Sequence, residues 1–222
     1  MNTEIETLYN QRFSETDKAR SRSIWKLLCD KYFSRFIRPQ DVVLDLACGS
    51  GHFINNILCS RKIGVDINSS VRSSLDSDVE FFNFDAKSFN TSLFIKIDVV
   101  FTSNFFEHLK DHKELELVLD QVLSVLKPEG KLLVMGPNIR YLGGRYWDFY
   151  DHRLALTHLS LKEVLELKGF KVELCLDKFL PYTTKSRLPK HPFLIDLYIR
   201  HPWLWNFFGK QFFLVAYKPK CI

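Results

Sequence analysis

Short runs of apolar residues alternate with more polar segments along residues 42–138, and each run ends in a polar residue or a glycine. Runs of this length that are rich in Val, Ile and Leu are typical of parallel strands covered on both faces. The segment between Phe53 and Leu58 has apolar residues at helical spacing and predicts a helix after the first strand. Such an alternation predicts an α/β fold. We expect its strands at residues 42–46, 62–68, 79–86, 97–104 and 131–138.

The two ends of the chain continue this pattern. An apolar stripe at helical spacing predicts a helical cap over residues 1–38, and Pro39 and Gln40 end that region. The main domain is expected over residues 39–222. Its later part predicts a helix over 160–168, closed by a glycine, and strands at 170–177 and 211–218.

Two connections in this domain are unusually long. Residues 137–159 and 178–210 exceed the usual connection of about two to six residues. Both leave strands at the carboxyl end, where open α/β sheets bind ligands. Because both are aromatic and basic, we interpret them as insertions that cover a substrate. The alternative is that they only wrap the core.

The end of the first strand carries the most specific chemical pattern. Asp45 stands at the exit of the strand, and Gly49 and Gly51 allow a sharp turn and a close approach of a ligand. A carboxylate repels a pyrophosphate but attracts an ammonium group, and Ile54 occupies the position of the third glycine of a dinucleotide fingerprint. The turn therefore favours a ligand with an amine and a carboxylate, such as the methionine end of S-adenosylmethionine.

The next two strands also end in acids. Asp66 follows the second strand, where a carboxylate can accept hydrogen bonds from both ribose hydroxyls. Asp85 follows the third strand and is placed to meet an adenine amino group. Three acids at successive strand ends predict one continuous cofactor site.

These motifs together resemble the class I S-adenosylmethionine-dependent methyltransferases, over roughly residues 36–177 and the last strand. The motifs are Leu-Asp-Leu-Ala-Cys-Gly-Ser-Gly, Gly-Val-Asp-Ile, Phe-Asp-Ala, Asn-Phe-Phe-Glu-His-Leu and Leu-Lys-Pro-Glu-Gly-Lys. The resemblance implies a doubly wound, Rossmann-like, mostly parallel seven-stranded sheet in a three-layer α/β/α arrangement. It also implies that the last strand runs antiparallel between its two predecessors. Ala47 stands where the family commonly has a glycine.

The resemblance also implies roles for particular residues. The Glu-His-Leu after the fourth strand is similar to the branch that methylates small molecules, quinone precursors and sugars. The residues implied to bind S-adenosyl-L-methionine are Asp45, Ala47, Gly49, Gly51, Asp66, Ile67, Asp85, Ala86 and Asn104.

Two histidines are candidates for catalysis. His108 lies where the resemblance places residues that face the methyl group, and a histidine titrates near neutrality. The alternative is a structural His108 paired with Glu107. His152 belongs to a second polar cluster in the first insertion, Asp151-His152-Arg153. We expect no metal site, because His52 has no partner at ligand spacing.

Composition narrows the class of protein. The chain has 222 residues, 46% of them hydrophobic and 26% charged, as expected for one globular α/β domain. Its polar, acidic start is unlike a signal peptide, and it has no apolar stretch long enough to span a bilayer. Five cysteines without a C-x-x-C pair are typical of the reducing cytoplasm, where we place the protein.

The C-terminal part is basic and aromatic. Between residues 178 and 222, eight Lys or Arg residues accompany a single acid, Asp196, whereas the whole chain has a net charge of +5. Basic charge among aromatic residues suits RNA, an anionic membrane surface or a phosphate-bearing substrate. The alternative is that the aromatic residues pack in the core and the charges are solvated.

Three functions are compatible with these features. The first, which we favour, is methyl transfer to a small-molecule, sugar or lipid-linked acceptor, with the accepting atom left open between oxygen, nitrogen and carbon. The second is an RNA methyltransferase that uses the C-terminal face. It is weakened by Ser103-Asn104-Phe105-Phe106, which replaces the Asn/Asp-Pro-Pro-aromatic motif used on exocyclic amines. The third is a non-catalytic protein that binds S-adenosylmethionine and scaffolds a partner.

Overall fold

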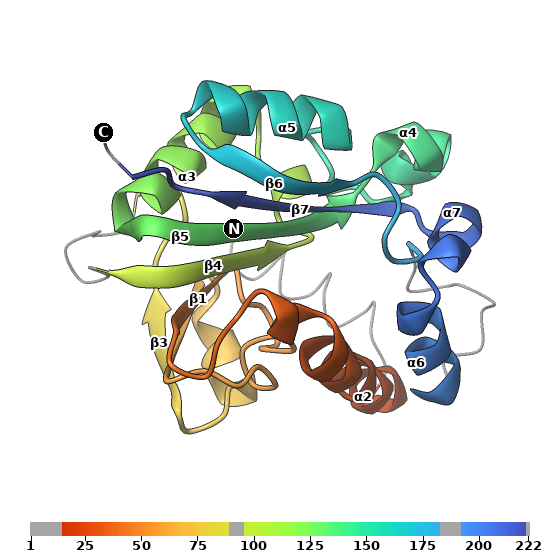
Figure 1. Ribbon diagram of the computed structural model, residues 1–222, viewed down its shortest axis with the longest axis horizontal. Helices are drawn as coiled ribbons and strands as arrows, with labels where there is room; N and C mark the ends of the chain where they lie inside the picture. The colour runs from red at the N-terminus through yellow and green to blue at the C-terminus, as the bar shows by residue number, and fades with distance from the viewer. Residues whose placement is uncertain (1–14, 89–95, 183–191, 221–222) are drawn as a thin grey trace.

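The computed structural model describes residues 15–88, 96–182 and 192–220 and has one seven-stranded sheet at its centre (Figure 1). The strand order is β3-β2-β1-β4-β5-β7-β6. Strands β1 to β5 pair in parallel, and β7 runs antiparallel between β5 and β6. The strands are β1 (Val42–Leu46), β2 (Arg61–Asp66), β3 (Val79–Asn83), β4 (Ile97–Ser103), β5 (Leu126–Pro137), β6 (Lys171–Leu176) and β7 (Gln211–Tyr217). The predicted sheet, including its antiparallel last strand, is confirmed.

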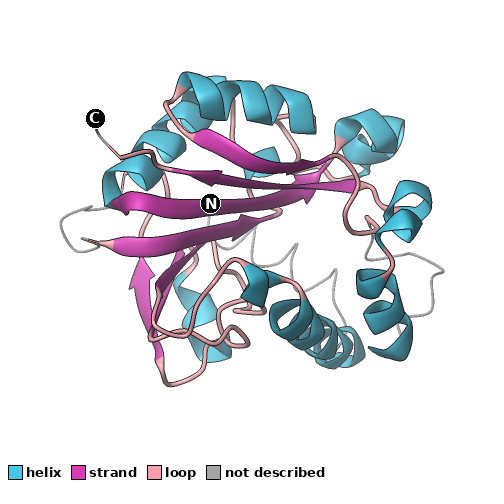
Figure 2. Ribbon diagram, viewed as in Figure 1, coloured by secondary structure: helices cyan, strands magenta, loops and turns pink. Residues whose placement is uncertain are grey.

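Helices lie on both sides of this sheet (Figure 2). The α-helices are α2 (Glu15–Lys31), α3 (His112–Val125), α4 (Ile139–Leu142), α5 (His158–Leu167), α6 (Pro192–Arg200) and α7 (Trp205–Phe208). Single 3-10 turns lie at Phe33–Arg35, Ser69–Ser74, Phe106–His108, Gly143–Asp148 and Pro202–Leu204. The three-layer α/β/α arrangement is therefore confirmed.

Each face of the sheet has its own hydrophobic core. On one face, α3 and α5 contribute side chains such as Leu119 and Leu165, both fully buried against the strands. On the other face, Leu28 and Phe33 from the N-terminal region pack on Phe101 of β4. Strands buried on both sides explain the near-continuous apolar runs in the sequence.

Local signals explain where the two long helices of the first face begin. The Asp111 carboxylate accepts a hydrogen bond from the backbone N–H of Glu114 at 3.0 Å and caps α3. The Thr157 hydroxyl likewise accepts from the N–H of Ser160 at 3.1 Å and caps α5. The second helix therefore begins two residues earlier than its predicted start at Ser160.

The predicted helix after the first strand is wrong. Residues 52–56 form turns, and only single helical-type bonds occur there, such as that from the Ile57 N–H to the Phe53 carbonyl at 3.0 Å. The Asn55 and Asn56 side chains donate instead to the carbonyls of Ser74 and His52. Asparagine side chains compete with helical hydrogen bonding in this way.

The long connections contain more structure than we expected. The first, at 137–159, contains α4 and a 3-10 turn. In the second, at 178–210, residues 183–191 lie outside the described residues, and the rest contains α6 and α7. Residues 1–14 of the predicted cap also lie outside the described residues, and α2 forms the described part of it.

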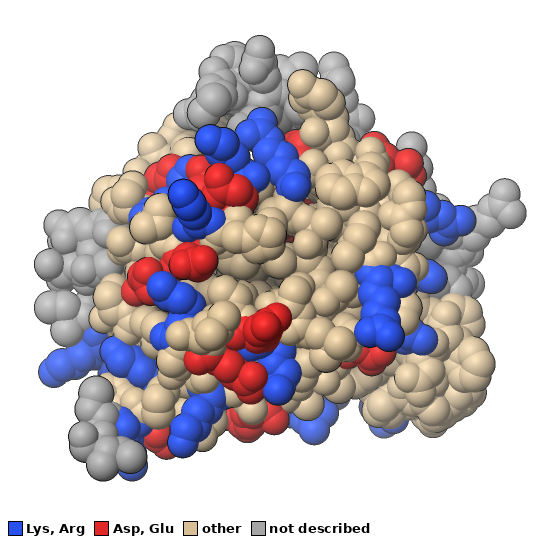
Figure 3. Space-filling view, turned by 90° about the horizontal axis from the view of Figure 1, so that it is seen from above, with Lys and Arg blue, Asp and Glu red and all other residues tan. Residues whose placement is uncertain are grey.

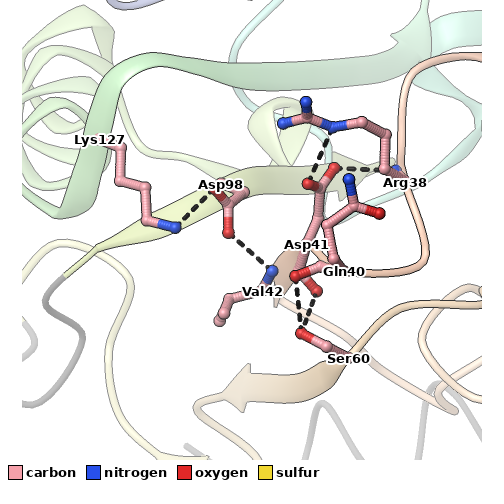
Figure 4. A network of polar contacts seen from close by, with 7 residues as sticks. All are labelled: Arg38, Gln40, Asp41, Val42, Ser60, Asp98 and Lys127. Carbon is pink, nitrogen blue, oxygen red and sulfur yellow. Dashed lines mark hydrogen bonds and ion pairs between the residues drawn. The ribbon is translucent and has the colours of Figure 1, made fainter.

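Polar contacts fix the amino-terminal edge of the sheet (Figure 4). The Asp98 carboxylate accepts from the Val42 N–H at 2.9 Å and pairs with Lys127 at 2.6 Å, which joins β1, β4 and the start of β5. The Asp41 carboxylate pairs with Arg38 at 3.1 Å. A cavity of about 380 Å³ beside Asp41 and Asp98 lies at this edge, opposite to the strand ends that carry the predicted site.

Membrane crossing and disulfides can be assessed for the described residues. No helix among them is both long and apolar enough to cross a lipid bilayer. Cys29, Cys48, Cys59 and Cys175 are free thiols.

Candidate functional site

The predicted cofactor residues gather at the carboxyl ends of four neighbouring strands. Asp45 lies in β1, Asp66 ends β2, Asp85 follows β3 and Asn104 follows β4. The order β3-β2-β1-β4 makes these strand ends one continuous edge. Ligands of open α/β sheets bind at such an edge. In Figure 1 the arrowheads of β4 and β5 point towards the end of the molecule that carries α4, α6 and α7.

Two buried acids form the centre of this edge. Asp45 is 3% exposed, and burial together with the neighbouring Asp66 charge raises the pKa of its carboxyl well above the usual value, against a lowering effect of the Ile54 N–H. Burial also raises the pKa of Asp66. Among the described residues neither acid is ion-paired with Lys or Arg. An ammonium group bound at Asp45 would offset the effect of the neighbouring Asp66 charge, and the site therefore fits the methionine end of S-adenosylmethionine.

The glycine turn is fastened directly to the second strand. Asp66 accepts hydrogen bonds from the backbone N–H of Gly49 at 2.9 Å and from that of Asn68 at 2.8 Å. The Cys48 N–H donates to the Val65 carbonyl at 3.0 Å. Each carboxylate oxygen has a second lone pair, so the acid retains acceptor capacity for a ribose hydroxyl.

The turn requires left-handed backbone at three residues, with φ of 59° at Ala47, 48° at Gly49 and 69° at Gly51. A side chain at Gly51 would be strained by this φ, and its Cβ would force the Leu75 and Asn55 side chains, at 2.4 Å and 3.0 Å, to shift. At Gly49 nothing lies within 4 Å of such a Cβ, so the backbone there is open to a ligand. Ala47 adopts this conformation at a cost of about 1–2 kcal/mol that glycine avoids.

The remaining predicted cofactor residues differ in their surroundings. Ile67 is 49% exposed and offers an apolar surface beside Asp66. The Asp85 carboxylate accepts from the Lys87 N–H at 2.9 Å and lies 3.5 Å from the Lys87 ammonium. Ala86 places its side chain in the core, so a contact with the cofactor has to come from its backbone. Asn104 is exposed, with φ of 49°, and its N–H donates to the Met135 carbonyl at 2.9 Å.

The N-terminal helix reaches the same edge. Trp25 of α2 stacks on His52, with ring centroids 6.4 Å apart, and meets Phe101 edge-on at 6.1 Å. Burial and the nearby Arg22 charge lower the pKa of His52, which favours a neutral ring in this stack. Trp25 was not predicted from the sequence, because one aromatic residue in a helical segment does not indicate a contact with the cofactor turn.

A second polar cluster lies where the first long connection meets the end of β4. The Glu107 carbonyl accepts from the N–H groups of Arg153 at 2.8 Å and Leu154 at 3.2 Å, which holds the connection against the strand exit. His108 Nδ1 lies 3.2 Å from Asp151 Oδ2 and 3.2 Å from the Asp151 carbonyl. Asp151 is therefore a partner of His108 that the sequence did not predict, and the structural alternative that pairs His108 with Glu107 stays open.

The two candidate histidines are neighbours. The His108 and His152 rings meet edge-on with centroids 5.2 Å apart. His152 is 8% exposed and lies between Phe149, stacked at 5.0 Å, and Tyr146 at 4.7 Å. The His108 side chain is more accessible, at 24%. His108, the more accessible of the two, is better placed to contact a substrate, whereas the buried His152 packs among aromatic rings.

Glu107 completes this cluster as a buried acid. It is 4% exposed, and burial raises the pKa of its carboxyl to about 8, so it is largely protonated at neutral pH. One ligand atom each from Glu107, His108 and His152 lie within 4.8 Å of one another, a spacing that could accommodate a cation. The sequence predicts no metal here, and that stays a prediction. A histidine that is oriented by a carboxylate, as His108 is by Asp151, is suited to accept a proton.

We expect Glu107→Gln to remove part of the pH dependence of stability. The pKa of this acid is raised from 4.5 to about 8, so its contribution is complete below the unfolded value and is lost as pH rises through 8. At about 1.4 kcal/mol per pH unit, the wild-type protein should lose roughly 2–3 kcal/mol between about pH 6 and pH 9 that the variant keeps. Urea denaturation of both proteins at both pH values measures this difference. Parallel pH profiles would contradict the burial of an ionisable acid here.

Comparisons with known proteins agree with this geometry. A family model described as a methyltransferase domain matches residues 11–174. A S-adenosylmethionine-dependent methyltransferase from Archaeoglobus fulgidus superposes with a TM-score of 0.62 at 23% identity, covering 89% of this chain and 94% of that one. The N-methyltransferase NodS from Bradyrhizobium japonicum WM9, in complex with S-adenosyl-l-homocysteine, gives a TM-score of 0.64 at 13% identity, with coverage of 97% and 98%.

A third similar fold belongs to a protein named for different chemistry. The cyclase SpnF gives a TM-score of 0.58 at 18% identity, covering 87% of this chain and 80% of that one. A comparison with curated proteins gave no match. The likeness to these solved structures shows a shared fold. The match of the family model to residues 11–174 is the evidence for the family of the chain.

Proposed function

The chain belongs to the family of S-adenosylmethionine-dependent methyltransferases, and from this premise we propose that it methylates a hydroxyl group of a small-molecule, sugar or lipid-linked acceptor. The observation that carries the proposal is the pair formed by His108 and Asp151 at the exit of β4, with Nδ1 and Oδ2 3.2 Å apart. A hydroxyl is a weak nucleophile, and an acceptor of its proton assists its attack. An accessible imidazole oriented by a carboxylate supplies such an acceptor.

The cofactor edge holds the methyl donor in this proposal. Asp45 receives its ammonium group, Asp66 and Asp85 receive the ribose and the adenine, and the glycine turn at Gly49 and Gly51 lies beside its methionine end. Ala47, Ile67, Ala86 and Asn104 complete the predicted contacts. Bound S-adenosylmethionine supplies a methyl group activated by its sulfonium.

The His108 pair manages the proton. With Nδ1–H donated to Asp151, the basic lone pair of the ring lies on the other nitrogen, Nε2, which in this proposal accepts a proton from the substrate hydroxyl. The hydroxyl oxygen forms its bond to the methyl carbon as the carbon–sulfur bond breaks, and the proton passes to Nε2. Asp151 stabilises the imidazolium that results. Because in-line transfer depends mainly on positioning, the aromatic wall around His152 contributes by orienting the acceptor.

RNA is a weaker candidate for the acceptor. Phosphate backbones require a continuous basic surface. On the face seen in Figure 3, Lys and Arg side chains are interspersed with Asp and Glu. Helix α5 and its end also carry opposite charges in pairs, Lys168 with Asp120 at 2.6 Å and Lys162 with Glu166 at 3.1 Å. This face therefore does not favour nucleic acid.

The test is transfer of labelled methyl groups to separated pools of lipid, glycan and small molecules, RNA and protein. We expect alkali-stable label in the lipid or the glycan and small-molecule pool, because an ether formed on a hydroxyl resists hydrolysis by base. Ribonuclease-sensitive label would overturn the acceptor assignment. Cofactor binding without label in any pool would favour the non-catalytic scaffold.

A further inference from the structure

An exposed apolar surface covers one end of the molecule. Among the described residues, 13 large hydrophobic side chains are exposed, and six of them fall within residues 193–208. Exposed apolar residues that occur singly are ordinary, but such a concentration marks an interaction surface. We call it the aromatic end, and its members are Phe193, Leu194, Leu197, Trp203, Phe207 and Phe208.

Helix α6 is apolar on both of its sides. Its inner side packs into the core through Ile199, which is 7% exposed, and α6 lies against α2. Its outer side carries Phe193, Leu194 and Leu197, which are 66%, 38% and 39% exposed. These exposed apolar side chains share the helix with the ion pair formed by Asp196 and Arg200, and their burial against a partner would be favourable.

The aromatic end is held rigidly by the residues beneath it. The Tyr198 hydroxyl donates to the Phe179 carbonyl at 2.5 Å, and the Trp205 indole N–H donates to the Tyr198 carbonyl at 2.9 Å. Trp203 and Phe207 stand above this base with ring centroids 6.3 Å apart and are 60% and 71% exposed. The rings are therefore presented to solvent by an ordered support.

The charges beside these rings are predominantly positive. Lys178 donates to the Asn206 carbonyl of α7 at 2.9 Å. Arg200 at the end of α6 keeps a side chain that is 64% exposed, although it pairs with Asp196 at 2.7 Å. Lys210 lies two residues after the end of α7, and its ammonium donates to the Tyr141 carbonyl at 3.1 Å. Aromatic and leucine side chains bordered by Lys and Arg match the interface of an anionic bilayer.

We infer that the aromatic end is a docking surface for an anionic lipid membrane. A second copy of the chain is a poorer occupant, because a symmetric contact through this surface would bring like charges together. The surface lies at the end of the molecule to which the β4 and β5 arrowheads point (Figure 1), and His108 lies on the 3-10 turn that follows β4. Docking there brings a lipid-linked acceptor to the candidate site. The inference concerns binding and stands without any methyl transfer.

The experiment is flotation of the full chain with vesicles of phosphatidylcholine alone or mixed with phosphatidylglycerol. We expect binding to the mixed vesicles that weakens with added salt. The double variant Trp203→Ser, Phe207→Ser should lower the bound fraction by about tenfold or more, because it removes apolar area that enters the interface. The matched control Leu58→Ser, Leu167→Ser removes two side chains that are 73% and 80% exposed elsewhere and should bind like the wild type.

Melting curves and cofactor binding establish that both double variants are folded. Equal binding by the Trp203–Phe207 variant and the wild type would overturn the inference, as would no binding to either kind of vesicle. Light scattering without lipid tests the other occupant. A dimer that the Trp203–Phe207 variant abolishes would assign the surface to self-association. Failure of methyl transfer with normal flotation would count against the proposed function alone.

Discussion

His108→Ala is expected to lower kcat by about 10²- to 10⁴-fold, the usual range for removal of a general base. The dissociation constant of S-adenosylmethionine should stay near that of the wild type, because His108 lies on the 3-10 turn after β4 and not in the glycine turn after β1. Single-turnover transfer and calorimetric binding measure the two quantities separately. A fully active variant would remove His108 as the proton acceptor.

Two further variants distinguish a catalytic His108 from a structural one. Asp151→Asn keeps the shape of the partner 3.2 Å from Nδ1 but removes its charge, so it should lower kcat less than His108→Ala. His112→Ala removes an exposed histidine four residues along the chain and should leave kcat unchanged. If His108 only supports the fold, melting temperature and cofactor affinity will fall together with activity.

The sequence predicted the cofactor edge better than the acceptor cluster, and the reason is local geometry. Asp45, Gly49 and Gly51 belong to one turn, so their relation is encoded in a few adjacent residues. Asp66 reaches the same turn through its bond to the Gly49 N–H, and parallel pairing of β1 with β2 brings these residues together. Such a relation follows from topology once the strands are recognised.

The His108 pair depends on a long-range contact that no periodicity reports. Asp151 lies 43 residues further along the chain, and the bonds from Arg153 and Leu154 to the Glu107 carbonyl bring it to His108. In the sequence Asp151 stands beside His152, and nothing there indicates its contact with His108. The helix predicted after β1 is wrong for a similar reason. The apolar residues there have helical spacing, but the Asn55 and Asn56 side chains donate to backbone carbonyls.

The position of Asp66 leads to the second large prediction. Asp66→Ala should weaken S-adenosylmethionine binding by about 100-fold or more and abolish labelling of any acceptor. The substitution removes the proposed ribose contact and frees the N–H groups of Gly49 and Asn68, which this carboxylate accepts at 2.9 Å and 2.8 Å. Hydrogen bonds to a charged group contribute roughly 1.5–3 kcal/mol each, so loss of the ribose contact and of turn order suffices for that factor.

Controls separate ligand contact from damage to the turn. Asp66→Asn keeps a carbonyl oxygen for the Gly49 N–H but removes the charge and one acceptor, so its affinity should lie between those of the wild type and the alanine variant. Glu80→Ala removes an acid of the neighbouring β3 that pairs with Arg61 at 2.7 Å on the surface, and its affinity should match the wild type. Calorimetric titration at equal folded fraction compares the four proteins. Wild-type affinity in the Asp66→Ala variant would contradict this cofactor site, because loss of the bond to the Gly49 N–H would then have no effect on binding.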